Sequence, residues 1–322
     1  MGADFTYVVA RLRAIEASMP DSSWFQRLAR TTEDSLLAVL REHFRGFEEI
    51  QSVHEFDDAL ERERVSYLDL LSKIIPDEKY TYFIKKSYDF DNLIRTWKGK
   101  KLDEEAHLYL CGNIHPDIVK SAVEHESLLD LPEYLKDLYE VLEGSYEASQ
   151  DISDAQFVGE SLKLQHLLST APDSDAKRYV TQIIDLENIK TFIRLKRIPL
   201  RKNVPECVWI PGGEIDEWRL KKLFQEGEEE FLAYLKLTSY RNVIAGELDS
   251  STPLWRVQTL LDRARLELLR ESRYQFFSFM PVLYHVELYE LNLRLVRTII
   301  TGILNRLQED QIAEQVEALL VA

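Results

Sequence analysis

Proline and glycine are scarce in this chain, at 10 and 11 of 322 residues, which favours long helices with few turns. The two cysteines, Cys111 and Cys207, share no CxxC spacing. They exclude a disulfide framework and are ordinary usage for a reducing compartment. The N-terminus lacks the basic and apolar regions of a secretory signal, so we expect none.

Long uncharged apolar runs are lacking as well. The strongest apolar stretch covers residues 276–304, and five ionisable residues interrupt it: His285, Glu287, Glu290, Arg294 and Arg297. A membrane helix needs roughly 18 residues that are nearly free of charge. We therefore interpret this stretch as a buried amphipathic helix.

The sequence also lacks motifs for catalysis. The sequence contains no HExxH, GxSxG or GxGxxG pattern, and the turn at residues 211–214 lacks the Lys and Ser/Thr of a phosphate loop. Glu104 and His107 have the spacing of one di-iron half-site, but such sites need a second pair and further glutamates. We expect a non-catalytic protein with no cofactor and no metal, with a di-metal enzyme at Glu104 and His107 as an alternative.

The net charge of the chain argues against nucleic acids and anionic lipids as partners. The chain carries 40 basic and 56 acidic residues, a formal net charge of -16. Such a surface repels nucleic-acid phosphates and anionic lipid headgroups. We therefore expect no direct nucleic-acid binding, whereas protein partners remain open.

Helical periodicity runs through almost the whole chain. Apolar residues at three- to five-residue steps predict a helix from Phe56 to Ile75, and another is expected over residues 174–197. Thr252 and Pro253 are interpreted as the N-cap and first residue of a third helix. Residues 208–210 are the one short stretch expected to be extended. The sequence predicts an all-α fold.

Three sequence signals recur in the same order about every 100 residues, which indicates a triplication. A Leu-rich helix recurs at residues 36–40, 134–138 and 231–235, and an acidic helix centred on Asn recurs at Asn92, Asn188 and Asn292. A glycine turn follows the first two acidic helices, at residues 112–114 and 213–215. We predict three similar helical units at residues 1–125, 126–222 and 223–322, arranged with approximate three-fold symmetry or as a short superhelical stack.

The three Asn residues each share a helical stripe with apolar residues, so a partly buried amide must find partners. We interpret them as structural residues that hydrogen bond to a neighbouring helix or loop; contact with a partner chain or ligand is the alternative. Two i, i+4 ion pairs are expected on the same helices, between Asp91 and Arg95 and between Glu290 and Arg294.

Basic residues gather just after the first two Asn helices. Cations favour helix C-termini, which is sufficient to explain them. Alternatively, three-fold symmetry collects them on one rim that docks an acidic partner. The candidate rim consists of Lys98, Lys100, Lys101, Lys196, Arg197, Arg201 and Lys202.

These features together resemble the C subunit of the V-type/A-type ATPases, the d-type central-stalk family, nearly end to end. The matching segments are the opening at residues 7–13 and 24–28, the repeated Asp91-Asn92-Leu93 and Glu187-Asn188-Ile189, the turn at residues 209–213, and the last repeat from Glu287 to Arg294. The chain departs from the family at Met19-Pro20 and at Leu291, where the other repeats have an acid, and this leaves the exact contacts open.

The resemblance implies a funnel of three helical units and a non-catalytic rotor role. A protein of this family joins a coiled-coil shaft heterodimer to the membrane ring of proteolipid subunits. It lies on the cytoplasmic face of the membrane as a peripheral part of an ion-translocating complex. Whether protons or sodium ions are moved, and in which direction the machine works, stays open. A generic helical adaptor outside any rotary motor is the alternative function.

Overall fold

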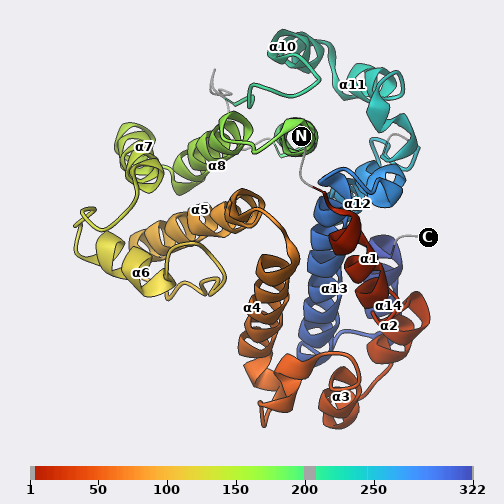
Figure 1. Cartoon of the computed structure of the whole chain (residues 1–322). Coiled ribbons are helices and arrows are strands. Elements are labelled where there is room, and N and C mark those ends of the chain that lie inside the picture. Colours follow the sequence, from red (N-terminus) through yellow and green to blue (C-terminus); the bar gives the residue numbers. More distant parts are fainter. Residues whose placement is uncertain (1–3, 199–207, 245, 321–322) are drawn as a thin grey trace. The chain divides into compact units, whose positions relative to one another are not determined.

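The computed structural model describes residues 4–198, 208–244 and 246–320 (Figure 1). Within these ranges the chain forms α-helices and short 3-10 helices, and no residue is in a strand. The prediction of an all-α fold is confirmed. Residues 208–210 are irregular rather than a strand. The three-fold funnel and the three unit boundaries stay predictions.

The helices follow one another along the chain with short connections. The α-helices are α1 (Thr6–Glu16), α2 (Ser22–Ala29), α3 (Glu33–Leu40), α4 (Phe56–Ile74), α5 (Glu78–Leu102), α6 (Pro116–Glu124), α7 (Glu133–Ser149), α8 (Ile152–Ser169), α9 (Ser174–Arg197), α10 (Glu217–Glu226), α11 (Glu228–Leu235), α12 (Leu254–Leu269), α13 (Met280–Leu304) and α14 (Glu309–Leu319). The 3-10 helices are η1 (Arg45–Glu48), η2 (Val53–Glu55), η3 (Ser239–Asn242) and η4 (Arg270–Tyr274).

The three predicted Asn helices are the longest in the described chain and nearly equal in length. They are α5, α9 and α13, with 25, 24 and 25 residues. The three Leu-rich segments are also helical and lie in α3, α7 and α11. The recurring sequence signals therefore mark recurring structural elements.

Two predicted helices lie where they were expected, to within one residue, and the start of a third is shifted. The helices expected at 56–75 and 174–197 are α4 and α9. At α12, however, Pro253 is the N-cap and Leu254 the first helical residue, one position later than predicted. The reason is local, because the Thr252 hydroxyl donates to Asp249 Oδ1 at 3.1 Å and accepts from Asp249 N at 3.0 Å, closing the preceding turn instead of capping the helix.

The chain divides into two compact units, and the divisions fall inside α4 and α9 and after the first residue of α10. The described part of the first unit comprises residues 4–67, 189–198, 218–244 and 246–320; that of the second comprises residues 68–188 and 208–217. Each unit has its own buried apolar residues, as units of this size can.

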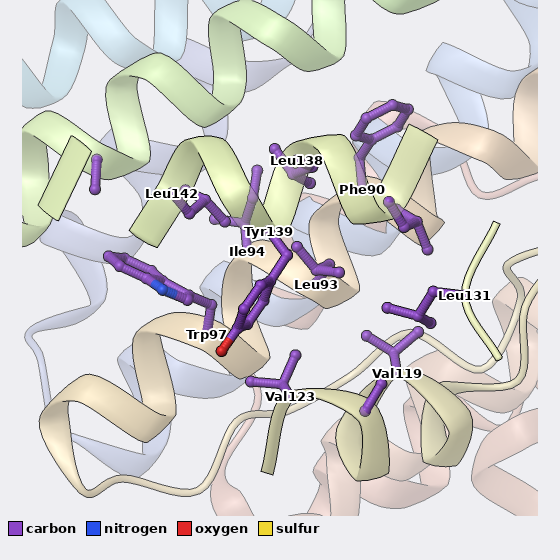
Figure 2. Packing of buried hydrophobic residues seen from close by; sticks show 13 residues of the cluster. Phe90, Leu93, Ile94, Trp97, Val119, Val123, Leu131, Leu138, Tyr139 and Leu142 are labelled. Atoms are coloured by element: carbon purple, nitrogen blue, oxygen red, sulfur yellow. The ribbon is translucent and has the colours of Figure 1, made fainter. Parts of the chain in front are cut away.

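In the second unit, α5 packs against α6, α7 and α8, and α7 lies along α8. Helical spacing explains the core: Phe90, Leu93, Ile94 and Trp97 follow i, i+3, i+4, i+7 and form one apolar stripe on α5. Equivalent stripes from α6 and α7 meet it (Figure 2). Gly159 of α8 lets the pair α7 and α8 approach, since a Cβ there would lie 2.7 Å from Leu142 Cδ2.

In the first unit, α13 packs against α1, α2, α3, α12, α14 and η4. The expected amphipathic helix over residues 276–304 is therefore real, but it begins at Met280, and Phe276 and Phe277 before it are exposed. Close packing of α14 on α13 depends on Gly302, where a Cβ would lie 2.8 Å from Ile312 Cγ1.

Candidate interaction surface and the polar clamps that support it

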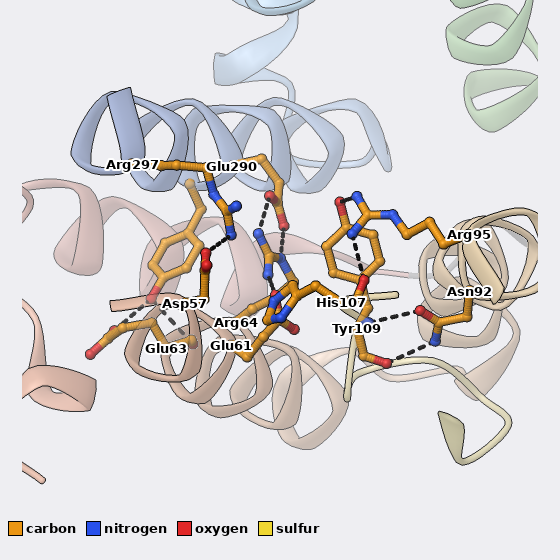
Figure 3. A network of polar contacts seen from close by, with 11 residues as sticks. Asp57, Glu61, Glu63, Arg64, Asn92, Arg95, His107, Tyr109, Glu290 and Arg297 are labelled. Carbon is orange, nitrogen blue, oxygen red and sulfur yellow. Dashed lines mark hydrogen bonds and ion pairs between the residues drawn. The ribbon is translucent and has the colours of Figure 1, made fainter. Parts of the chain in front are cut away.

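Asn92 of α5 holds the loop that follows its own helix. Its amide Nδ2 donates to the Tyr109 carbonyl at 2.8 Å, and its Oδ1 accepts from Tyr109 N at 2.7 Å. The Asn92 side chain thus satisfies both backbone groups of one loop residue, as the right-hand side of Figure 3 shows. The interpretation of Asn92 as a structural residue is confirmed.

Asp89, one turn before Asn92, binds the glycine turn. Its carboxylate is completely buried and accepts from Ile114 N at 2.9 Å, Asn113 Nδ2 at 2.9 Å and the Tyr134 hydroxyl at 3.0 Å. Burial raises the pKa of Asp89, and the hydrogen bonds to it act in the opposite direction. The turn needs glycine at position 112, because a Cβ there would lie 2.3 Å from Asp89 Oδ1.

The second Asn helix repeats this arrangement 96 residues later. Asn188 Nδ2 donates to the Ile210 carbonyl at 2.9 Å, and its Oδ1 accepts from Ile210 N at 2.9 Å. Asp185 accepts from Glu214 N at 2.8 Å and Ile215 N at 3.1 Å. We call each Asp-x-x-Asn set with its glycine turn a clamp: Asp89 and Asn92 with residues 109–114, and Asp185 and Asn188 with residues 210–215.

Within the described part of the chain, the third Asn helix forms no clamp. The position three before Asn292 is Tyr289 rather than Asp, and the side chain of Asn292 contacts Met19 Sδ at 3.6 Å. No glycine turn follows this helix in the sequence. The Asp and the glycine turn are therefore present together or missing together, which fits their direct contact in the two clamps.

Instead, α13 forms a buried polar seam with α4 (Figure 3). Arg64 Nε donates to Glu290 Oε1 at 2.8 Å, and Arg64 also pairs with Glu61. The Tyr289 hydroxyl donates to Glu63 Oε2 at 2.8 Å. The side chains of Arg64 and Glu61 are 7% and 2% exposed, so water solvates them poorly and each charge is stabilised by the opposite charge beside it.

Two aromatic residues and one histidine extend this seam. Tyr67 stacks on Tyr289 with ring centroids 4.0 Å apart, and its hydroxyl lies 2.7 Å from His285 Nδ1. Burial raises the pKa of both tyrosines and lowers that of His285 to about 4. The seam therefore keeps its tyrosine hydroxyls protonated and its imidazole neutral near neutral pH.

The two ion pairs predicted along single helices are wrong. Asp91 pairs with Lys163 of α8, and Arg95 donates to the His107 carbonyl at 3.0 Å. Glu290 pairs with Arg64, whereas Arg294 pairs with Asp262 of α12 at 2.7 Å. Partners on other helices or loops prevail because an i, i+4 pair contributes only about 0.3–0.5 kcal/mol.

The candidate rim residues on α5 all have partners within their own unit. Lys100 Nζ donates to the Val123 carbonyl and to Glu126, both at 2.8 Å, and Lys101 Nζ binds Glu143 at 2.7 Å. Lys98 Nζ lies 3.5 Å from Gln156 Oε1. These contacts fasten the end of α5 to α6, α7 and α8.

On α9, Arg197 is a hub of hydrogen bonds. It donates to Glu228 Oε1 at 2.8 Å and to the carbonyls of Asp249 and Thr252. Lys196 Nζ lies 4.3 Å from the centre of the Phe224 ring. Arg201 and Lys202 lie outside the described residues, as does Cys207. The rim as a docking surface stays a prediction.

The comparisons with known proteins identify the family. Residues 8–315 match the profile of the ATP synthase (C/AC39) subunit. The chain is 27% identical to the C subunit of the A-type ATP synthase of Methanocaldococcus jannaschii, over 96% of this chain and 85% of that protein. It is 25% identical to the corresponding protein of Desulfurococcus sp., covering 96% and 90%, and 24% identical to that of Thermococcus gammatolerans, covering 96% and 89%.

The chain belongs to the ATP synthase (C/AC39) subunit family. The resemblance noted in the sequence is thereby confirmed, and this member of the family is all-helical over its described residues.

The ranges described for this family member contain no cluster of three His, Cys, Asp or Glu side chains that could hold a metal ion. Glu104 and His107 are both exposed and belong to the loop after α5. The glycine turn at residues 211–214 is part of the second clamp. Over the same ranges, none of the helices is long and apolar enough to cross a membrane.

Sequence reasoning missed the polar seam of this family member. A signal was present in the helix at residues 56–75, where Glu61 and Arg64 share a stripe with Leu68 and Leu71 at i, i+3, i+7, i+10 steps. Charged residues on an otherwise apolar stripe indicate buried pairs. Their partner Glu290 lies 226 residues further along, and no local pattern identifies it.

Proposed function

We propose that this chain is the non-catalytic central-stalk subunit of an A/V-type ATP synthase or ATPase. In this role it couples the coiled-coil shaft to the membrane ring of proteolipid subunits. The observation that carries the proposal is the family match over residues 8–315, together with three relatives that are each named as the C subunit of an A-type ATP synthase. ATP chemistry then occurs in other subunits.

The internal structure suits a part that transmits torque. Each clamp ties a connecting loop to a long helix through buried hydrogen bonds, and the polar seam joins two further helices. Close-packed interiors have low compressibility and transmit strain rather than absorb it. A chain whose loops are fastened in this way can pass a force from one partner to another without deforming.

In this role the chain lies on the cytoplasmic face of the membrane as a peripheral part of the complex. Its partners are the shaft heterodimer and the proteolipid ring, and it binds no nucleic acid. A net charge of -16 supports docking through protein contacts rather than through phosphate groups.

The candidate rim is the part of the surface we assign to docking. Its described members are Lys98, Lys100, Lys101, Lys196 and Arg197, with Arg201 and Lys202 outside the described residues. The Lys100 side chain keeps 28% of its surface exposed while its Nζ binds the Val123 carbonyl and Glu126, so an acidic partner docking there would compete with Glu126 for its charge.

Native mass spectrometry of the full chain mixed with the shaft heterodimer of its own organism tests the role. We expect a one-to-one-to-one complex at about 10 µM, which captures dissociation constants in the micromolar range. Absence of any complex at that concentration contradicts the coupling role and favours the alternative, a helical adaptor outside rotary motors.

The rim needs a variant that separates docking from internal contacts. Lys100→Glu reverses the charge and also removes the pair with Glu126, whereas Glu126→Gln removes the same pair but keeps the lysine. Glu126 is 71% exposed at its side chain, which makes it a matched control. If Lys100 docks, Lys100→Glu weakens shaft or ring binding and Glu126→Gln does not. Equal binding by both variants removes Lys100 from the rim.

A further inference from the structure

Three exposed aromatic side chains lie within four residues of one another, where η4 connects to α13. Tyr274, Phe276 and Phe277 are 59%, 49% and 82% exposed. Elsewhere in the described ranges, each exposed large apolar side chain stands apart from the next along the sequence. Water solvates aromatic rings unfavourably, so a group of them on the surface is typical of an interaction site.

The residues that follow the exposed rings hold this connection in place. Phe279 is fully buried, and its ring centroid lies 5.7 Å from that of Phe5, the N-cap of α1. Met280 N donates to the Ser278 hydroxyl oxygen at 3.1 Å, which fixes the start of α13. A surface that is ordered before it binds loses little conformational entropy on docking.

Two guanidinium groups flank the ring of Tyr274. The Cζ atoms of Arg13 and Arg273 lie 4.4 and 4.7 Å from the centre of this ring. Arg13 Nη2 donates to the Arg273 carbonyl at 2.9 Å and Arg13 also pairs with Glu16, whereas Arg273 pairs with no carboxylate of the described chain. We call Tyr274, Phe276, Phe277, Arg13 and Arg273 the aromatic patch.

The surroundings of the aromatic patch are poor in acid. No Asp or Glu occurs over residues 272–286, although the chain contains 56 acidic residues. On α1, four exposed residues follow i, i+3, i+4, i+7 spacing without an acid among them: Tyr7, Ala10, Arg11 and Ala14. The aromatic patch is therefore a locally basic surface on a protein whose net charge is -16.

This composition distinguishes the occupants that could cover the aromatic patch. A symmetric dimer would place Arg13 and Arg273 against their own copies, and like charges disfavour that contact. The net charge of the chain repels an anionic lipid surface. A protein helix with aliphatic side chains beside carboxylates matches both the rings and the guanidinium groups, and Tyr, Phe and Arg are enriched at protein interfaces.

We propose that the aromatic patch docks a helix at the end of the coiled-coil shaft, an inference that rests on the proposed function. Coiled-coil helices carry an apolar seam flanked by charged residues, often Glu, and at the end of the coil the seam loses part of its cover. Phe276 and Phe277 pack on these seam residues, and Arg273 binds a flanking carboxylate. The lysines of the candidate rim on α5 differ, because each of them already has a partner within the chain.

Isothermal titration of the full chain with the shaft heterodimer of its own organism tests the aromatic patch. Phe277→Ser removes the most exposed ring, and circular dichroism should show an unchanged fold because this ring is 82% exposed. We expect the dissociation constant to rise about 30-fold. Leu237→Ser, at an 85% exposed position after α11 in the same unit, is the matched control and should change it by less than about two-fold. Equal affinities of Phe277→Ser and the wild type overturn the proposal.

The salt dependence of the same titration tests Arg273. Arg273→Gln should flatten the rise of the dissociation constant with salt, because it removes one ion pair with the shaft. Arg256→Gln is the control, since Arg256 is exposed, pairs with no carboxylate of the described chain and lies at the opposite end of α12 from η4. Equal salt dependence in the two variants overturns the assignment of a shaft carboxylate to Arg273.

The remaining outcomes separate this surface from the coupling role and from other occupants. A wild-type chain that forms no complex with the shaft contradicts the proposed function itself. A wild-type complex that Phe277→Ser leaves unchanged overturns the docking surface alone. If Phe277→Ser weakens binding to the detergent-solubilised proteolipid ring but not to the shaft, or abolishes a dimer of the chain seen by native mass spectrometry, the aromatic patch belongs to that other partner and the proposal is overturned.

Discussion

Asp185 and Gly213 lie so close that a Cβ on Gly213 would be 2.0 Å from Asp185 Oδ1. The same relationship joins Asp89 to Gly112 at 2.3 Å. In each case the carboxylate binds the backbone N–H groups just beyond the glycine, and only a residue without a side chain allows this approach. The two clamps thus explain why glycine occurs at positions 112 and 213 in a chain with few glycines.

Gly213→Ala should destabilise the protein by about 1–3 kcal/mol, because Asp185 must move and leave buried N–H groups unpaired. Chemical denaturation followed by circular dichroism measures the change in the free energy of unfolding. Gly144→Ala is the matched control, since nothing lies within 4 Å of the Cβ it would add on α7. There we expect stabilisation of about 0.5–1 kcal/mol. Equal effects at the two positions would contradict the clamp.

The three repeated Asn residues should differ in importance. Asn188→Leu leaves the Ile210 N–H and carbonyl unpaired and should cost about 2–3 kcal/mol in the free energy of unfolding. Asn292→Leu removes only a 3.6 Å contact to Met19 Sδ and should change stability by less than about 0.5 kcal/mol. Urea unfolding of both variants checks this; a larger loss at Asn292 than at Asn188 would show that the third Asn has a role we have not assigned.

The buried pair Arg64–Glu290 should show strong coupling. Arg64→Gln should cost about 3 kcal/mol in unfolding free energy, because it removes the cation that Glu61 and Glu290 share, whereas Glu290→Gln should cost less, because Arg64 keeps its pair with Glu61. The double variant should cost clearly less than the sum.

The exposed pair Arg297–Asp57 links the same two helices and serves as the control. Its side chains are 43% and 39% exposed, so its coupling should stay below about 1 kcal/mol. A thermodynamic cycle for each pair, measured at the same pH, compares the two. Coupling at Arg64–Glu290 no larger than at Arg297–Asp57 would contradict the burial argument.

Acidification should destabilise the first unit through His285. Burial lowers the pKa of His285 to about 4 in the folded state, below the ordinary value of 6.5. The unfolded chain therefore binds more protons between these values, and stability falls as pH drops from about 6.5 to about 4. A shift of this size corresponds to roughly 3 kcal/mol.

His285→Phe should flatten that part of the pH profile of unfolding free energy. His166 in the second unit contributes in the same direction, since burial and the nearby Lys86 lower its pKa too. Its contribution should remain in the His285→Phe variant. An unchanged slope in that variant would contradict the neutral, buried state of His285.

Local sequence patterns predicted the helices correctly wherever the interactions that determine them join residues close together in the sequence. Apolar residues at three- to five-residue steps from Phe56 to Ile75 predict a helix because side chains at this spacing point in one direction, and α4 spans Phe56–Ile74. Pro76 after α4 and the loop before Ser174 likewise mark boundaries through backbone chemistry. The shifted start of α12 shows the limit, because Asp249 competed for the Thr252 hydroxyl.

The clamps could be predicted from the sequence only in part. The sequence displayed the Asn helices and the glycine turns as separate repeating signals, and it predicted that each Asn would be structural. It did not indicate that the Asp three residues before Asn92 and before Asn188 binds the turn that follows 25 to 30 residues later. That contact requires the chain to double back, which is decided by packing.

The sequence by itself determined the helical class, the positions of most helices, the repeating order of their elements and the family, because all of these depend on local periodicity or on residue order. Only the tertiary structure decided the partners of the charged and polar side chains. Asp91 pairs with Lys163 rather than with Arg95, and Glu290 pairs with Arg64 rather than with Arg294. A buried charge is stabilised by whichever opposite charge reaches it with good geometry, and proximity along the helix contributes too little to compete.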